Sequence, residues 1–66
     1  MDNLSKTDLN QAVLRASKHA VRALKRNDDA AAYTSLKALV HMQIRMHNHK
    51  KAIKIIETAR EIFPDF

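Results

Sequence analysis

Residues 45–64, RMHNHKKAIKIIETAREIFP, contain a turn signal, an amphipathic segment and a terminating proline in direct succession. Apolar residues recur along this segment at intervals of three and four, the spacing that places side chains on one face of an α-helix. These apolar residues are Ala52, Ile55, Ile56, Ala59, Ile62 and Phe63. Pro64 cannot continue a helix because proline lacks a backbone N–H. The stretch therefore predicts a helix over about residues 50–63.

The RMHNHKK part of this stretch, residues 45–51, reads as a solvated turn between two helices. Asn48 tolerates the left-handed backbone conformation, so we expect it to stop the preceding helix. That helix is predicted over about residues 30–46. Its apolar face comprises Tyr33, Leu36, Leu39, Val40 and Met46, with Ile44 at the edge. A connection this short predicts that the two helices pack antiparallel, as a helical hairpin.

Asn27-Asp28-Asp29 is a second break, because these side chains bond nearby backbone N–H groups and favour turns and helix starts. A first helix is predicted before it, over about residues 8–26, with Ser5 or Thr7 as its N-cap. Leu9, Val13, Ala16, Ala20 and Leu24 share one face of that helix. The predicted fold is all-α: one small helical domain over residues 1–66, a three-helix arrangement whose second and third helices form an antiparallel hairpin.

The composition agrees with helices and predicts marginal stability. The 66 residues include no Gly, no Cys and one Pro, so strands with tight turns are disfavoured and no disulfide can form. A domain of this size buries only about 60% of its unfolded surface. The N-terminal MDNLSKTDLNQ has no apolar signal region, and no apolar run reaches the roughly 20 residues of a membrane span. We expect a cytoplasmic protein.

The pattern of the second and third helices resembles a known repeat. Ala52 and Ala59 stand at small positions, with the large apolar Ile56 between them and Pro64 at the end. Leu36 and Leu39 match apolar positions of a first helix, whereas Val40, Gln43 and His47 depart from the residues that the family prefers. Residues 33–66 thus resemble a single tetratricopeptide repeat (TPR), a helix–turn–helix unit of 34 residues. The resemblance implies a TPR-like hairpin and a protein-binding role, without any catalytic residue.

Several apolar residues exceed what three short helices can cover. Leu14 and Val21 lie one heptad apart and outside the main face of the first helix, and Met42 and Met46 widen the apolar face of the second. We predict that these four residues contact another protein chain, in a homo-oligomer or a hetero-complex. The alternative is that they are single exposed apolar residues, which are common.

The charge balance favours an acidic partner, since 12 Lys and Arg residues against 7 Asp and Glu give +5. A basic stripe on the first helix comprises Arg15, Lys18, Arg22, Lys25 and Arg26. Lys50 and Lys51 oppose the dipole at the start of the third helix. We predict that these seven residues contact an acidic protein or nucleic acid, the alternative being a solvated charged face.

Metal binding and catalysis have little support in the residues. His41, His47 and His49 lie in a region without any acidic residue between Asp29 and Glu57, and the basic residues there would repel a cation. There is no Gly-rich phosphate loop, no cysteine nucleophile and no pair of carboxylates beside a histidine. We expect no enzyme activity, no metal site and no cofactor.

The predicted function is that of a small intracellular protein-binding adaptor, chaperone-like factor or regulator, acting through an apolar helical surface flanked by basic residues. One alternative is a nucleic-acid-binding regulatory protein that uses the basic stripe. Another is a small structural subunit of a larger assembly.

Overall fold

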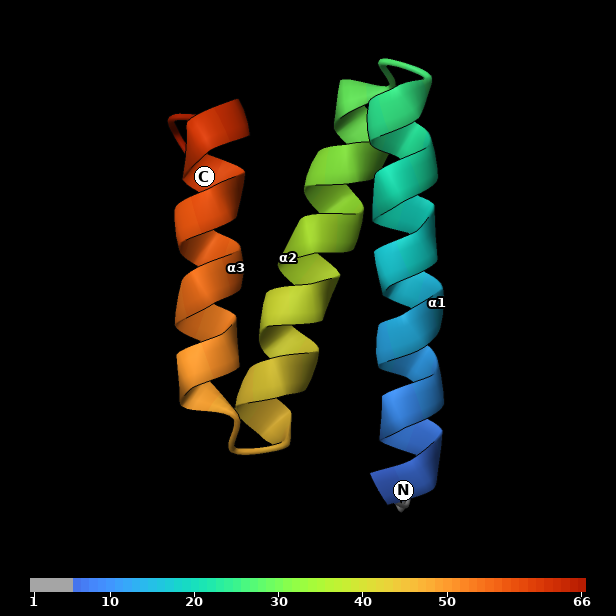
Figure 1. Cartoon of the computed structure of the whole chain (residues 1–66), viewed down its shortest axis with the longest axis vertical. Helices are drawn as coiled ribbons and strands as arrows, with labels where there is room; N and C mark the ends of the chain where they lie inside the picture. Colours follow the sequence, from blue (N-terminus) through green and yellow to red (C-terminus); the bar gives the residue numbers. More distant parts are fainter. Residues whose placement is uncertain (1–5) are drawn as a thin grey trace.

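A computed structural model describes residues 6–66 of the chain and contains three α-helices (Figure 1). The helices are α1 (Lys6–Lys25), α2 (Asp29–Arg45) and α3 (His49–Ile62). Each predicted helix begins and ends within two residues of the observed one, so the prediction of an all-α, three-helix chain is confirmed. Thr7 lies inside the first turn of α1 and so is not its N-cap, and Ser5 lies outside the described residues.

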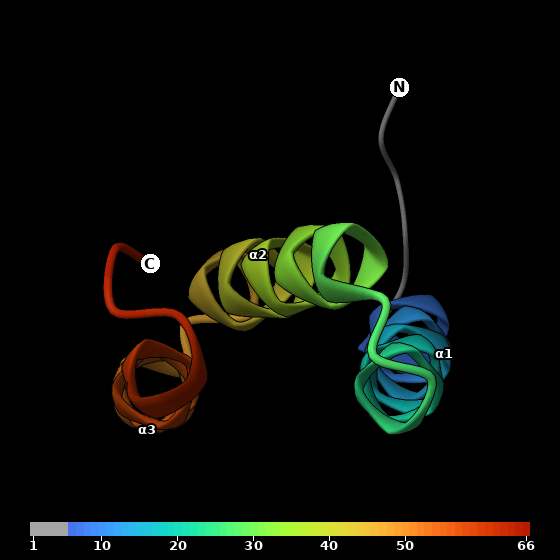
Figure 2. The ribbon, with the colours of Figure 1, turned by 90° about the horizontal axis from the view of Figure 1, so that it is seen from above.

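Helix α2 lies between the other two helices and packs against both of them. Consecutive helices run antiparallel (Figure 1), as the short turns require. Seen along the helices in Figure 2, α1 and α3 lie on the same side of α2, like the arms of a V. Within residues 6–66, no Cα atom of α1 lies within 8 Å of a Cα atom of α3. The arrangement is therefore an open one, unlike a closed three-helix bundle.

Alanine dominates the buried surfaces between the helices. The buried apolar residues are Ala16, Ala20 and Ala23 on α1, Ala32, Leu39 and Val40 on α2, and Ala52 and Ala59 on α3. Small side chains let helix backbones approach closely, but each removes little apolar surface from water. Among the described residues, no large side chain is fully buried. Residues 6–66 thus pack along two thin interfaces, α1 with α2 and α2 with α3, which we call the first and second seams, and form no thick core.

The turn between α1 and α2 ends α1 with a left-handed residue. Asn27 has φ 58°, its N–H donates to the Leu24 carbonyl at 3.1 Å, and the Asp28 N–H donates to the Ala23 carbonyl at 2.8 Å. This pair of bonds is a Schellman motif, which satisfies carbonyls that the end of a helix leaves free. Asp28 is then the N-cap of α2, and its carboxylate accepts a bond from the Ala31 N–H at 3.3 Å.

The turn between α2 and α3 repeats this motif 20 residues later and corrects one prediction. The left-handed residue is His47, with φ 60°, and the expected left-handed conformation of Asn48 is wrong. Asn48 is instead the N-cap of α3, a position at which asparagine is strongly preferred. Its side chain makes no capping bond, and its Nδ2 donates to Oε1 of the buried Gln43 at 3.1 Å.

Beyond α3, the C-terminal residues fold back onto α2. The ring of Tyr33 meets the rings of Phe63 and Phe66 edge-on, with centroids 5.5 and 5.2 Å apart. Lys37 extends its Nζ atom to 5.0 Å from the centre of the Phe66 ring, a cation–π contact. A proline-containing turn, closed by the Phe66 N–H donating to the Phe63 carbonyl at 2.9 Å, makes this geometry possible.

Candidate functional site

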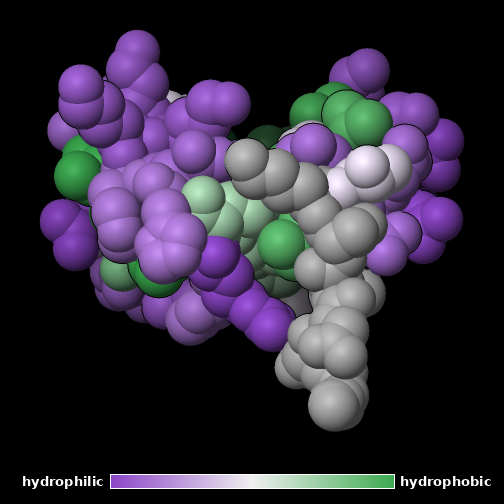
Figure 3. Space-filling view, turned by 90° about the horizontal axis from the view of Figure 1, so that it is seen from below, coloured by the Kyte–Doolittle hydropathy of each residue, from purple (hydrophilic) through white to green (hydrophobic). Residues whose placement is uncertain are grey.

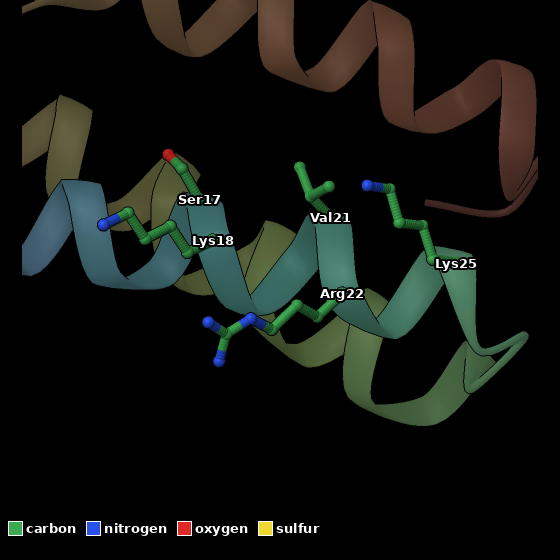
Figure 4. A pocket seen from close by; sticks show the side chains of 5 residues that line it. All are labelled: Ser17, Lys18, Val21, Arg22 and Lys25. Atoms are coloured by element: carbon green, nitrogen blue, oxygen red, sulfur yellow. The ribbon is translucent and has the colours of Figure 1, made fainter.

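A wall of exposed side chains on α1 faces α3 across the open side of the V. Val21 is 51% exposed, and Leu14, one heptad earlier on the same side of the helix, is 55% exposed. Figure 4 shows Ser17, Val21 and Lys25 pointing from α1 toward α3. A buried core residue normally contacts many neighbours, so branched apolar side chains that stay half exposed opposite a second helix are unusual.

The floor and the opposite wall of this space come from α2 and α3. Leu36 and Leu39 line a depression of about 220 Å³ together with Ile55, Thr58 and Lys54. Ile62 follows Ile55 by one heptad, so it shares that face of α3, and it is 44% exposed.

Helices α1, α2 and α3 border one open hollow. In the space-filling view of Figure 3, it lies between the lobes of α1 and α3 and has apolar surface on its floor. We call this space the groove. Its apolar lining comprises Leu14 and Val21 of α1, Leu36 and Leu39 of α2, and Ile55 and Ile62 of α3.

Lysines flank the apolar lining of the groove. Lys25 points to the groove from α1, and Lys54 lines the depression on α3. Lys51 precedes Ile55 by one helical turn, so it lies on the groove face of α3, and it is exposed. Glu61, near the C-terminal end of α3, is exposed as well. The rim is therefore basic on α1 and on the N-terminal half of α3.

The four residues predicted as the apolar contact do not form one surface. Leu14 and Val21 belong to the groove. Met42 is half-buried in the seam between α1 and α2, beside Ala38, Arg15 and His19. Met46 is half-buried at the C-cap of α2. Both methionines thus fill spaces next to α2, a role that suits their flexible side chains.

The basic residues of the α1 stripe do not all point in one direction. Arg15, Lys18, Arg22 and Arg26 are exposed, and Arg22 points away from α3 in Figure 4. Lys25 is exposed too, but it points toward α3 beside Val21. Lys18 and Arg22 nevertheless line one depression with Ser17, Val21 and Lys25, so they adjoin the α1 wall of the groove, whereas Arg15 and Arg26 do not line that depression.

The first turn of α3 carries the remaining basic residues. Lys50 and Lys51 are exposed, and together with His47, Asn48 and His49 they line a shallow depression at the turn. The rings of His47 and His49 meet edge-on with centroids 6.4 Å apart. Within residues 6–66, no three His, Cys, Asp or Glu side chains are grouped so that they could hold a metal ion. Over the same residues, no helix is long and apolar enough to cross a membrane.

Sequence reasoning missed the α2 and α3 parts of the groove. Leu36, Leu39 and Ile55 sit on apolar faces that were expected to pack inside the hairpin. They do lie between α2 and α3 of the hairpin. They also border the open space, because α1 does not contact α3. Periodicity shows that a face is apolar, and it contains no signal for how much of that face a neighbouring helix covers.

Comparisons with models of protein families, with curated proteins and with solved structures find no match to this chain. The resemblance of residues 33–66 to a tetratricopeptide repeat remains a prediction from the sequence pattern.

Proposed function

We propose that this protein is a small adaptor or regulator, not an enzyme, and that it binds a segment of another protein in the groove. One observation carries the proposal: Val21 on α1 and Ile62 on α3 are each about half exposed, Val21 points toward α3, and Ile62 shares the groove face of Ile55. Filling that space would remove apolar surface from water on three helices at once.

The lysines of the rim define the chemistry of the partner. Lys25, Lys51 and Lys54 flank the apolar lining, so an amphipathic segment with acidic residues beside its apolar face would fit both features. A second copy of the chain fits less well, because each copy carries a net charge of +5. The TPR-like pattern of α2 and α3 supports a protein-binding role of the same kind.

A photo-crosslinking residue tests the groove directly. Benzoylphenylalanine would replace Val21 in one variant and Ile53 in a control. Ile53 is 55% exposed on α3 but lies on the face away from Ile55 and Ile62. In the cells that produce the protein, we expect a discrete adduct from position 21 that is absent from position 53. Peptide mapping should place that adduct in an acidic, amphipathic segment.

The contrary outcomes are equally specific. Identical adducts from both positions, or none from position 21, would remove the groove as a binding site. An adduct between two copies of this chain, with sedimentation as a dimer that Val21→Glu abolishes, would replace the acidic partner with self-association. Substituting Leu14 and Val21 with serine should weaken partner binding at least about tenfold, as expected for apolar anchors.

A further inference from the structure

The solvent-exposed side of α1 presents a row of cations next to the groove. Arg15, Lys18, Arg22 and Arg26 follow one another at intervals of three, four and four residues, so they lie along one side of the helix. All four are exposed, and Arg22 points away from α3 in Figure 4. Arg15, Lys18 and Arg22, with His19 between them, border a common shallow depression of about 160 Å³. We call these four cations the outer basic face.

Acidic residues are absent from the middle of this region. Between Asp8 and Asp28 the chain contains five basic residues and no acidic one, and no acidic residue follows between Asp29 and Glu57. Asp8 precedes Arg15 by about two helical turns, and Asp28 lies in the turn that follows α1. The positive charge of Arg15, Lys18 and Arg22 therefore has no acidic neighbour one turn away on the same helix.

The kind of cation and its spacing fit a polyanion with regularly spaced charges. Three of the four side chains are arginines, whose guanidinium groups can bind phosphate oxygens through two parallel hydrogen bonds. The eleven-residue step from Arg15 to Arg26 corresponds to roughly 16 Å along a helix. That length spans about five base-pair steps of a duplex.

Other anionic partners fit this face less well. A protein interface needs apolar anchors at its centre, but the apolar residues nearest this face, Leu14 and Val21, lie only at its edge beside Lys18. The lack of an apolar side chain among the four cations themselves disfavours insertion into a lipid surface. Among residues 6–66, Tyr33, Phe63 and Phe66 are gathered between α2 and the C-terminus, so α1 offers only the small imidazole of His19 as a platform for unpaired bases.

We propose that the outer basic face of α1 binds the phosphate backbone of a nucleic-acid duplex without reading its base sequence. This face adjoins the groove, because Lys18 and Arg22 line one depression with Val21 and Lys25, so a bound duplex would lie beside the α1 wall of the groove. Four phosphate contacts predict that log K falls with log salt at a slope of about −3.6. Affinity should then drop roughly a hundredfold between about 50 mM and about 200 mM salt.

Fluorescence anisotropy with a labelled DNA or RNA duplex of about 20 base pairs tests this proposal at those two salt concentrations. The test variant replaces Arg15, Lys18, Arg22 and Arg26 with glutamine, which keeps helix propensity while removing four charges. The matched control removes four charges from α3 by Lys50→Gln, Lys51→Gln, Lys54→Gln and Arg60→Gln. We expect the test variant to lose duplex binding and the control to stay within about threefold of the unchanged protein.

Several results would overturn the proposal. These are no duplex binding at 50 mM salt, an equal loss in both variants, or tighter binding to a single strand of the same sequence. Equal or tighter binding to polyglutamate, or to vesicles containing phosphatidylserine, would assign the face to a different anion. Ile62→Ser, on the α3 side of the groove and away from α1, should leave duplex affinity unchanged, so failure of this site and failure of the groove can be distinguished. Circular dichroism checks that every variant keeps its helices.

Discussion

The seam between α1 and α2 and the seam between α2 and α3 hold two helices together in different ways. The first is the more extensive and is made of alanines along its length, chiefly Ala16, Ala20, Ala23 and Ala32. The second is less extensive: it buries Ala52 and Ala59 of α3 and is held in addition at its two ends, by the Asn48–Gln43 bond and by the rings around Tyr33. Both seams require close approach at their buried alanines, but the second is shorter and belongs to a terminal helix, so it can widen with less loss of contact.

A larger side chain in the first seam should break it. Ala32 is fully buried on α2, so Ala32→Leu forces α1 and α2 apart, and we expect a loss of about 2–3 kcal/mol of unfolding free energy. For a domain of this size the midpoint of thermal unfolding should fall by roughly 10 °C or more. Ala30→Leu, two residues earlier and exposed, is the control and should be nearly neutral. Comparable losses in both variants would show that α2 is not closely packed at Ala32.

The same substitution in the second seam should have a smaller and more local effect. Ala59 is fully buried on α3, but α3 has no second neighbour and can swing outward when Ala59→Leu is introduced. We expect a loss of about 1–2 kcal/mol. Hydrogen exchange should accelerate in α3 while the amides of α1 stay protected. Uniform acceleration over all three helices would contradict the difference between the seams.

Removing the aromatic contact at one end of the second seam should weaken that seam without affecting the first. Phe66→Ala deletes the ring that meets both Tyr33 and Lys37, and we expect a loss of about 1 kcal/mol. Exchange should rise at the C-terminal end of α3 and not in the first seam. Ile53→Ala is the control, because Ile53 is 55% exposed and its truncation should cost little. An equal change from both substitutions would mean that the aromatic contacts add no stability.

Substitutions in the two turns should have the smallest effect on the free energy of unfolding, and that effect should be stabilising. His47 and Asn27 both have positive φ, but asparagine tolerates this conformation better than histidine. Glycine relieves about 1–2 kcal/mol of strain at such a position, partly offset by about 0.5–1 kcal/mol of extra freedom in the unfolded chain. We expect His47→Gly to raise the unfolding free energy by roughly 0.5 kcal/mol. Asn27→Gly should raise it less, as urea unfolding followed by circular dichroism would measure.

The helices themselves were predictable, because their apolar periodicity and turn residues act locally. The first turn could have predicted the second, because the two are 20 residues apart. His47 corresponds to the left-handed Asn27, and Asn48 corresponds to the N-cap Asp28. Reasoning from the preference of asparagine alone chose Asn48 as the left-handed residue, because it did not weigh the competing N-cap position.

The groove was less accessible to prediction. Leu14 and Val21 were recognised as surplus apolar residues, and both line it. Met42 was placed in the same set, but it fills the opposite side of the first seam. Whether a wide apolar face is covered depends on the angle between α1 and α3 across α2. That angle results from the packing of both seams together, and no single helix encodes it.

The separation of α1 from α3 has a consequence for cooperativity. With α2 as the sole neighbour of both, the described helices form a linear chain of nearest-neighbour couplings, in which each outer helix can unfold without directly disturbing the other. A segment bound in the groove would touch both outer helices and turn that linear chain into a closed ring. Binding would then sharpen the unfolding transition as well as raise its midpoint, because α1 and α3 would have to unfold together.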